Sequence, residues 1–384
     1  MRIDDIVAGR EVVICAGGGG VGKTTCAAAL AAGMAQRGRR VLVVTIDPAR
    51  RLAEALGLPE AGGDEHPVEL ETANGGQLAA LMLDARETFD RLIAEQAPSP
   101  EARRRILANP IYQQLAGAVA GSHEYMAMEK LYELDRAGGY DLLVLDTPPS
   151  RHALDFLDAP ERLTRFVEGR ALRLLLGGGL RAGVLGLRAL SPAARGSQLA
   201  LGLLERLTGM TLLRDLSEFL AGFEGMYEGF RDRARAVSDL LASERTTFLV
   251  VTVPEEEPVV EAERFWRALA ERDLPFGGAI VNKVHPDLLS GGRLSRERLR
   301  AEAEAALLDE DVAAETAARA AENLIHYQGL AERDRANIER LEARLGAEPV
   351  LEVPYLDHDV HDLPGLLELA DLLFRTRAGE RALH

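Results

Sequence analysis

The chain has 384 residues, of which 47% are hydrophobic, so it is long enough to bury a large core. It carries 61 acidic against 45 basic residues and a formal net charge of −16, which argues against a broad nucleic-acid-binding surface. Its two cysteines, Cys15 and Cys26, suit neither a disulfide framework nor a metal motif, which indicates a reducing cytoplasm.

The chain begins with Met1–Asp5, which carries acids and no apolar segment, so we expect no signal peptide. From there on, short apolar runs alternate with amphipathic helical patterns, which is typical of a doubly wound, mostly parallel sheet. The expected strands span Glu11–Cys15, Arg40–Ile46, Leu78–Leu83, Tyr140–Leu145, Thr246–Val253, Phe276–Val281 and Val350–Val353. The sequence therefore predicts an α/β fold.

Two intervals between these strands are much too long for simple crossover helices. They span about residues 85–136 and 153–243 and carry helical patterns, so we expect helical insertions that form a subdomain. The segment Glu60–Gly76 is rich in Gly, Glu and Asp and is expected to be a flexible surface loop.

The first expected strand runs into a complete phosphate-binding loop, Gly17-x-x-x-x-Gly22-Lys23-Thr24, followed by an alanine-rich helix. Glycines let backbone N–H groups converge on a phosphate, and the helix N-terminus adds partial positive charge. Lys23 would reach the β- and γ-phosphates, and Thr24 would ligate Mg²⁺. The expected nucleotide contacts are Gly19, Gly20, Val21, Gly22, Lys23, Thr24 and Thr25. We expect residues 1–384 to form a single P-loop ATPase domain that uses ATP and Mg²⁺.

Two later strand ends carry aspartates, Asp47 and Asp146. Ligands of open parallel sheets bind at the carboxyl ends of the strands, so both side chains belong near the loop. Asp146 occupies the place of the carboxylate that holds Mg²⁺ through water. Asp47 would orient or deprotonate the attacking water. Alternatively, it caps the helix that begins at Pro48, and the two roles can coexist.

These motifs resemble those of the deviant-Walker ATPases, and among them the arsenical-pump (ArsA-type) and tail-anchored-protein-targeting ATPases. The resemblance covers essentially the whole chain and rests on Gly19-Gly20-Val21-Gly22-Lys23-Thr24-Thr25, Asp47-Pro48-Ala49, Asp146-Thr147-Pro148-Pro149 with His152, and Ile280-Val281-Asn282-Lys283. It implies ATP hydrolysis by a nucleotide-sandwich dimer. It also implies that Asn282 hydrogen-bonds adenine and that the loop at Pro354 borders the base, whereas a plain turn role is the alternative for Asn282.

One loop position departs from this family pattern. The family carries a signature lysine at the second residue of the loop, which reaches the partner's phosphates across the dimer, and this chain has Gly18 there. Three interpretations stay open: a slow homodimeric ATPase, a heterodimer whose paralogous partner supplies the lysine, and a substitute cation. The candidates for a substitute are Arg50, Arg51 and Arg151, and we favour Arg50 or Arg51 because they closely follow Asp47.

The second insertion contains a basic and apolar segment. Residues 169–204 hold five arginines and no acidic residue, and helically spaced apolar residues continue to Phe230. Residues 169–230 would suit a groove for an apolar client helix or the surface of an anionic membrane. Packing against the core or another subunit is the alternative, and we favour it for the apolar residues after 204. The arginines argue against a membrane span.

Together these features predict an ATP-hydrolysing dimeric switch whose nucleotide state controls a helical subdomain that binds a hydrophobic client or a membrane partner. The alternative is a slow or non-hydrolysing nucleotide-binding subunit of a heterodimer with a regulatory role. A metalloid-pump subunit is disfavoured, because two cysteines cannot form a three-thiolate arsenite site. We expect a cytoplasmic protein, with a peripheral place at the membrane as the alternative.

Overall fold

The computed structural model describes residues 2–46, 51–58, 63–72, 74–110, 112–113, 123–147, 226–288, 301, 305 and 314–375. Within them, one eight-stranded sheet has the order β3-β4-β2-β5-β1-β6-β7-β8. Its strands are β1 (Val12–Ala16), β2 (Arg40–Thr45), β3 (Glu65–Val68), β4 (Gln77–Met82), β5 (Leu142–Asp146), β6 (Thr246–Thr252), β7 (Phe276–Val284) and β8 (Val350–Pro354). All neighbouring strands are parallel except β3, which pairs antiparallel with β4. The predicted α/β class with a mostly parallel sheet is confirmed.

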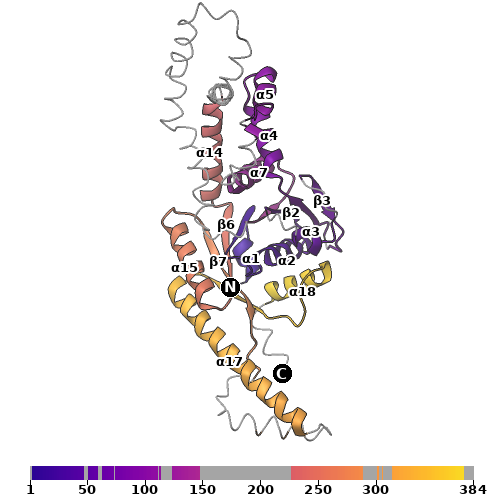
Figure 1. Ribbon diagram of the computed structural model, residues 1–384, viewed down its shortest axis with the longest axis vertical. Coiled ribbons are helices and arrows are strands. Elements are labelled where there is room, and N and C mark those ends of the chain that lie inside the picture. Colours follow the sequence, from indigo (N-terminus) through magenta and orange to yellow (C-terminus); the bar gives the residue numbers. More distant parts are fainter. Residues whose placement is uncertain are drawn as a thin grey trace, which may run out of the picture.

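Helices cover both faces of the sheet (Figure 1). One face carries α1 (Ile3–Val7), α2 (Lys23–Gln36), α3 (Arg51–Ala55) and α18 (Leu363–Phe374). The other carries α4 (Ala85–Gln96), α5 (Pro100–Leu107), α7 (His123–Ala137), α14 (Tyr227–Ala242), α15 (Glu256–Ala270) and α17 (Ala314–Leu345). Because both faces are covered, the central strands are buried throughout and read as continuous apolar runs. In β1, Val12 and Ile14 face one core, and Val13 and Cys15 face the other.

The expectation of a loop at Glu60–Gly76 was wrong for Glu65–Val68, which form the edge strand β3. The strand is short, acidic and contains Pro67, so its composition is typical of a loop. A proline lacks the backbone N–H that an inner strand needs, but an edge strand tolerates it. Residues Glu65–Val68 therefore form a strand because they pair with β4, and not because of their local sequence preference. The strand β7 also continues to Val284, beyond the expected end at Val281.

The described parts of the two long intervals are helical. Residues 85–137 contain α4, α5 and α7, and α14 occupies the end of the second interval. In Figure 1, α4, α5 and α14 rise above the sheet, whereas α17 extends below it. Met226 and Phe230, at the end of the apolar stripe, are buried in the core, as the packing interpretation predicts. Residues 169–225 lie outside the described part. No described helix has the length and apolar character needed to cross a membrane.

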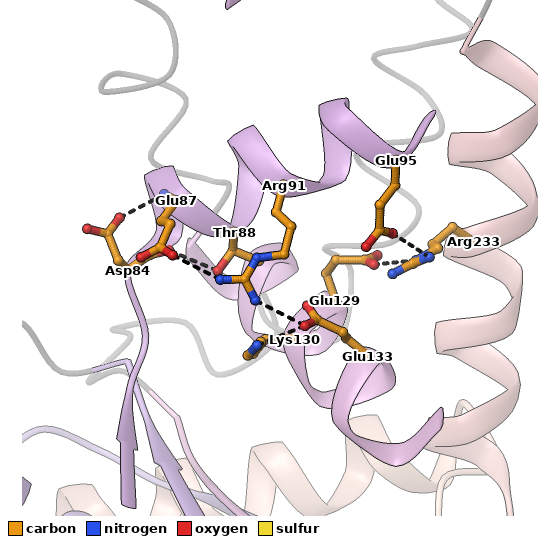
Figure 2. Close-up of polar contacts among 9 residues, drawn as sticks. All are labelled: Asp84, Glu87, Thr88, Arg91, Glu95, Glu129, Lys130, Glu133 and Arg233. Atoms are coloured by element: carbon orange, nitrogen blue, oxygen red, sulfur yellow. Dashed lines mark hydrogen bonds and ion pairs between the residues drawn. The ribbon is translucent and has the colours of Figure 1, made fainter. Parts of the chain in front are cut away.

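Ionic contacts join three of the helices above the sheet (Figure 2). Arg233 of α14 pairs with Glu95 of α4 at 3.1 Å and with Glu129 of α7. Arg91 of α4 pairs with Glu133 of α7 at 3.1 Å. Glu129 is only 1% exposed, so its carboxylate depends on the Arg233 guanidinium to compensate for its lost hydration. Burial raises the pKa of Glu129, and Arg233 acts in the opposite direction.

We predict that Arg233→Met lowers the free energy of unfolding by about 3 kcal/mol at neutral pH, because it leaves a buried carboxylate without its cation. The loss should shrink as the pH falls, since the folded variant then binds a proton on Glu129 at a pH where the unfolded chain does not. Urea denaturation at several pH values measures both effects. The control is Arg235→Met on the same helix, whose exposed side chain makes one 3.7 Å ion pair. An equal loss in the two variants would contradict the prediction.

Candidate nucleotide-binding site

The loop between β1 and α2 approaches its neighbours so closely that two of its residues must be glycine. A Cβ at Gly17 (φ +153°) would lie 2.1 Å from the Val251 carbonyl oxygen. A Cβ at Gly22 (φ +91°) would lie 2.3 Å from Asn282 Nδ2. Both backbones also adopt a conformation that other residues avoid. The glycines of the motif therefore let the loop pack against the ends of β6 and β7.

Lys23 lies at the start of α2 and turns back over the loop. Its side chain is buried, and Nζ donates a hydrogen bond of 2.8 Å to the Gly18 carbonyl oxygen. The helix cap, Gly22, has no side chain with which to accept a bond from the first N–H groups of α2. The positive end of the helix and the ammonium group thus lie together at the loop, which is the arrangement that binds phosphate.

A buried carboxylate joins this loop to two further strand ends. Asp146, at the end of β5, is 0% exposed. Its Oδ2 accepts a hydrogen bond of 2.6 Å from Thr24 Oγ1 and another of 2.9 Å from Thr45 Oγ1. Hydroxyl and carboxylate oxygens are hard donors of the kind that Mg²⁺ prefers. The donor set at this point therefore fits a magnesium ion.

The two cysteines beside this site are free and buried. Burial, with a smaller contribution from the Asp146 carboxylate, raises the pKa of Cys15 well above its usual range. Burial likewise raises the pKa of Cys26 to about 12. Both groups are therefore protonated thiols at neutral pH, which makes them poor ligands for soft metals.

Asn282 ties the end of β7 to the loop. Its side chain is buried, and Nδ2 donates a hydrogen bond of 3.0 Å to the Val21 carbonyl oxygen. β7 continues for two residues beyond Asn282, and the contact of Asn282 with adenine stays a prediction.

These elements surround a cavity of about 590 Å³, a volume within the range of nucleotide and cofactor sites. One end is formed by the loop and the start of α2, and the other by the chain after β8. The predicted site residues that line it are Gly20, Gly22, Lys23, Thr24, Thr25, Asn282 and Pro354. The structure therefore brings together residues that lie more than 300 positions apart in the chain.

Some predicted residues do not line this cavity. Gly19 lies on the exposed outer side of the loop, and Val21 is buried beneath it. Asp47, Arg50 and Arg151 lie outside the described part of the chain. Arg51 begins α3, but its side chain is also outside the described part. Their predicted roles stay predictions.

Sequence reasoning missed three residues at the site. Thr45 bonds Asp146, and Thr147 donates from Oγ1 to the Cys15 carbonyl oxygen at 3.0 Å. The third, Lys283, lines the cavity. A threonine in or beside a strand is ordinarily a simple β-former, so neither threonine stands out. Their position beside strand-end aspartates was the available signal.

The loop, the strand-end carboxylate and the cavity at the carboxyl edge of a parallel sheet define a P-loop nucleotide-binding protein. The model of the anion-transporting ATPase family (ArsA_ATPase) matches residues 10–176 and 193–310, and the chain belongs to this family. It is therefore an ATPase.

Relatives span most of the chain. ATPase ARSA2 of Chlamydomonas reinhardtii is 27% identical over 78% of this chain and 75% of its own length. An ATPase ASNA1 homolog of Trypanosoma cruzi is 29% identical over 71% of this chain and 74% of its own length. ATPase GET3 of Podospora anserina is 27% identical over 71% of this chain and 72% of its own length.

We predict that Thr45→Val lowers the kcat/KM for ATP about tenfold, because the buried Asp146 carboxylate loses the hydroxyl donor of Thr45. Steady-state ATPase assays across a Mg²⁺ titration measure the effect. Thr45→Ser keeps the hydroxyl and should retain most of the wild-type rate. A wild-type rate in the valine variant would show that this hydrogen bond is dispensable.

Proposed function

We propose that the protein is an ATP-hydrolysing switch that acts as a nucleotide-sandwich dimer and controls its helical subdomain through its nucleotide state. The proposal rests on the bonding of Asp146. This residue contacts the phosphate loop through Thr24, and the chain leads from it into the second helical insertion. A change at the phosphates would therefore reach the helices through the Thr24–Asp146 hydrogen bond and the chain that follows Asp146.

The roles of the site residues follow from their chemistry. The backbone of Gly19–Thr25 and the ammonium group of Lys23 would hold the phosphates. Asn282 and Pro354, which line the cavity, would contact the adenine base. Thr24, and Asp146 through water, would hold Mg²⁺, which would supply positive charge to the phosphate oxygens. Asp47 orients or deprotonates the attacking water.

The helical subdomain is formed by α4, α5, α7 and α14 together with residues 153–225 in this proposal. Arg233 joins α14 to α4 and α7, so these helices are positioned to respond as a unit. Within the predicted span 169–230, residues 169–204 would provide the surface for a hydrophobic client or for a membrane, because they are apolar and basic without a single acid. Met226 and Phe230, at the end of the span, are buried in the core and belong to no such surface. A slow or non-hydrolysing heterodimer subunit is the second candidate, favoured by Gly18 at the position of the family's signature lysine.

A metalloid-pump role has little support from this chain. It has two cysteines, whereas an arsenite site of the soft-ligand kind needs three thiolates. Both thiols are also buried and have raised pKa values.

We predict that Asp47→Asn lowers kcat at least about 100-fold, because it removes the group that handles the water. Binding of ATP should stay within about threefold of wild type, since the phosphate loop is unchanged. Turnover assays, ATP titrations and mass measurement in solution test the proposal together.

The wild-type mass should double on addition of ATP and Mg²⁺. A monomer that hydrolyses ATP at the same rate at every protein concentration would overturn the dimer.

The replacement for the missing lysine has its own test. We predict that either Arg50→Ala or Arg51→Ala lowers kcat at least about tenfold, because a cation at the transition state contributes several kcal/mol. Arg40→Ala serves as the control, since Arg40 is exposed at the start of β2 and pairs with Asp141 at 2.7 Å. Unchanged rates in both test variants would remove these arginines from the mechanism.

A further inference from the structure

Lys283 has a strained backbone at the point where β7 meets the phosphate loop. Its φ of +60° lies in the left-handed region, which a lysine adopts at a cost of about 1 kcal/mol or more. The pairing of β7 with β8 is also irregular between Val281 and Val284. Such irregularities re-aim side chains next to functional sites.

The irregularity has a visible effect on two consecutive side chains. In a regular strand, Asn282 and Lys283 would point to opposite faces of the sheet. Here both reach the same loop. Asn282 Nδ2 contacts the Val21 carbonyl oxygen at 3.0 Å, and Lys283 Nζ lies 3.4 Å from the Gly20 carbonyl oxygen. The strained backbone thus directs the ammonium group of Lys283 to the rim of the cavity that Lys23 and Thr24 also line.

The ammonium group of Lys283 is available to a ligand. The residue is exposed, and its contact with Gly20 is longer than an ordinary hydrogen bond of about 2.7–3.2 Å. No ion pair between described residues involves Lys283. On the other side of the loop, a Cβ at Gly18 would lie 2.7 Å from Glu261 Oε2, so the neighbouring side chain at that position is acidic.

Lysine is also rare in this chain. Of the 45 basic residues only three are lysines, namely Lys23, Lys130 and Lys283. Lys130 is buried and pairs with Glu133 at 2.9 Å in the helical region. The other two both line the nucleotide cavity. A lysine is a compact point charge that suits a phosphate oxygen, whereas arginine supplies most of the positive charge elsewhere in the chain.

We infer that Lys283 binds an oxygen of the polyphosphate of the nucleotide held by its own subunit. It thereby supplies, within one chain, a second ammonium group at a loop where Gly18 supplies none. The inference rests on the proposed nucleotide site but concerns binding affinity, whereas the arginines that follow Asp47 concern the rate of hydrolysis.

The test is the binding of ADP, ATP and adenosine to the full-length chain, measured by calorimetric titration. Lys283→Met should weaken ADP and ATP about 10- to 100-fold, the effect of one charged hydrogen bond, and should leave adenosine within about twofold. Lys283→Arg should stay within about threefold of wild type for all three ligands. Arg235→Met, which removes an exposed charge on α14, should bind like the wild type.

A second variant separates charge from backbone strain. Lys283→Gly removes the charge but accepts the left-handed backbone without cost, so it should raise the thermal midpoint and still weaken ADP as much as Lys283→Met does.

Wild-type affinity for ADP in both variants would overturn the inference. Equal weakening of ADP and adenosine would also overturn it, because the effect would then lie in the shape of the site. Failure of the wild-type chain to bind any of the three ligands would instead overturn the proposed function, and this inference with it.

Discussion

The hydrogen bonds of the buried Asp146 carboxylate are the contacts on which the site depends. A carboxylate with no exposed surface is costly unless its oxygens are bonded, and here one oxygen accepts from hydroxyl groups on two other segments. Those segments are the start of α2 and the end of β2. The register of the sheet makes this possible, since Asp146 lies opposite Cys15 on one side and Thr45 on the other. The same strand register therefore fixes both the pairing of the sheet and the geometry of the site.

The helices above the sheet are held together differently. Their apolar contacts are supplemented by a cluster of charges in which Arg233 reaches two helices at once. A buried ion pair adds little net stability over apolar packing, but it penalises any arrangement that separates its members. The cluster therefore favours a defined relative placement of α4, α7 and α14. That property suits a subdomain that must move without losing its internal order.

The phosphate loop and Asp146 could be predicted from sequence because their residue types and spacing indicate the chemistry, and because each follows or ends an apolar strand. The fold class followed from the alternation of apolar and amphipathic segments. The edge strand β3 could not be predicted, since Pro67 and the neighbouring acids disfavour a strand until β4 provides the partner. Thr45 and Lys283 were missed for a related reason. The role of Thr45 arises from strand register, and its place two residues before Asp47 was the available signal. The role of Lys283 arises from the irregular backbone near the end of β7, which has no local pattern.

Two carbonyl oxygens of the phosphate loop accept hydrogen bonds from side chains of the same chain: Gly18 accepts from Lys23, and Val21 accepts from Asn282. A loop held in this way by its oxygens has fewer conformations to lose when its N–H groups take up a ligand. The entropy of ordering the loop is therefore lost largely during folding, before any nucleotide arrives. Nucleotide affinity and the folding of β7 against the loop are thus coupled, and a change that loosens the end of this strand weakens both.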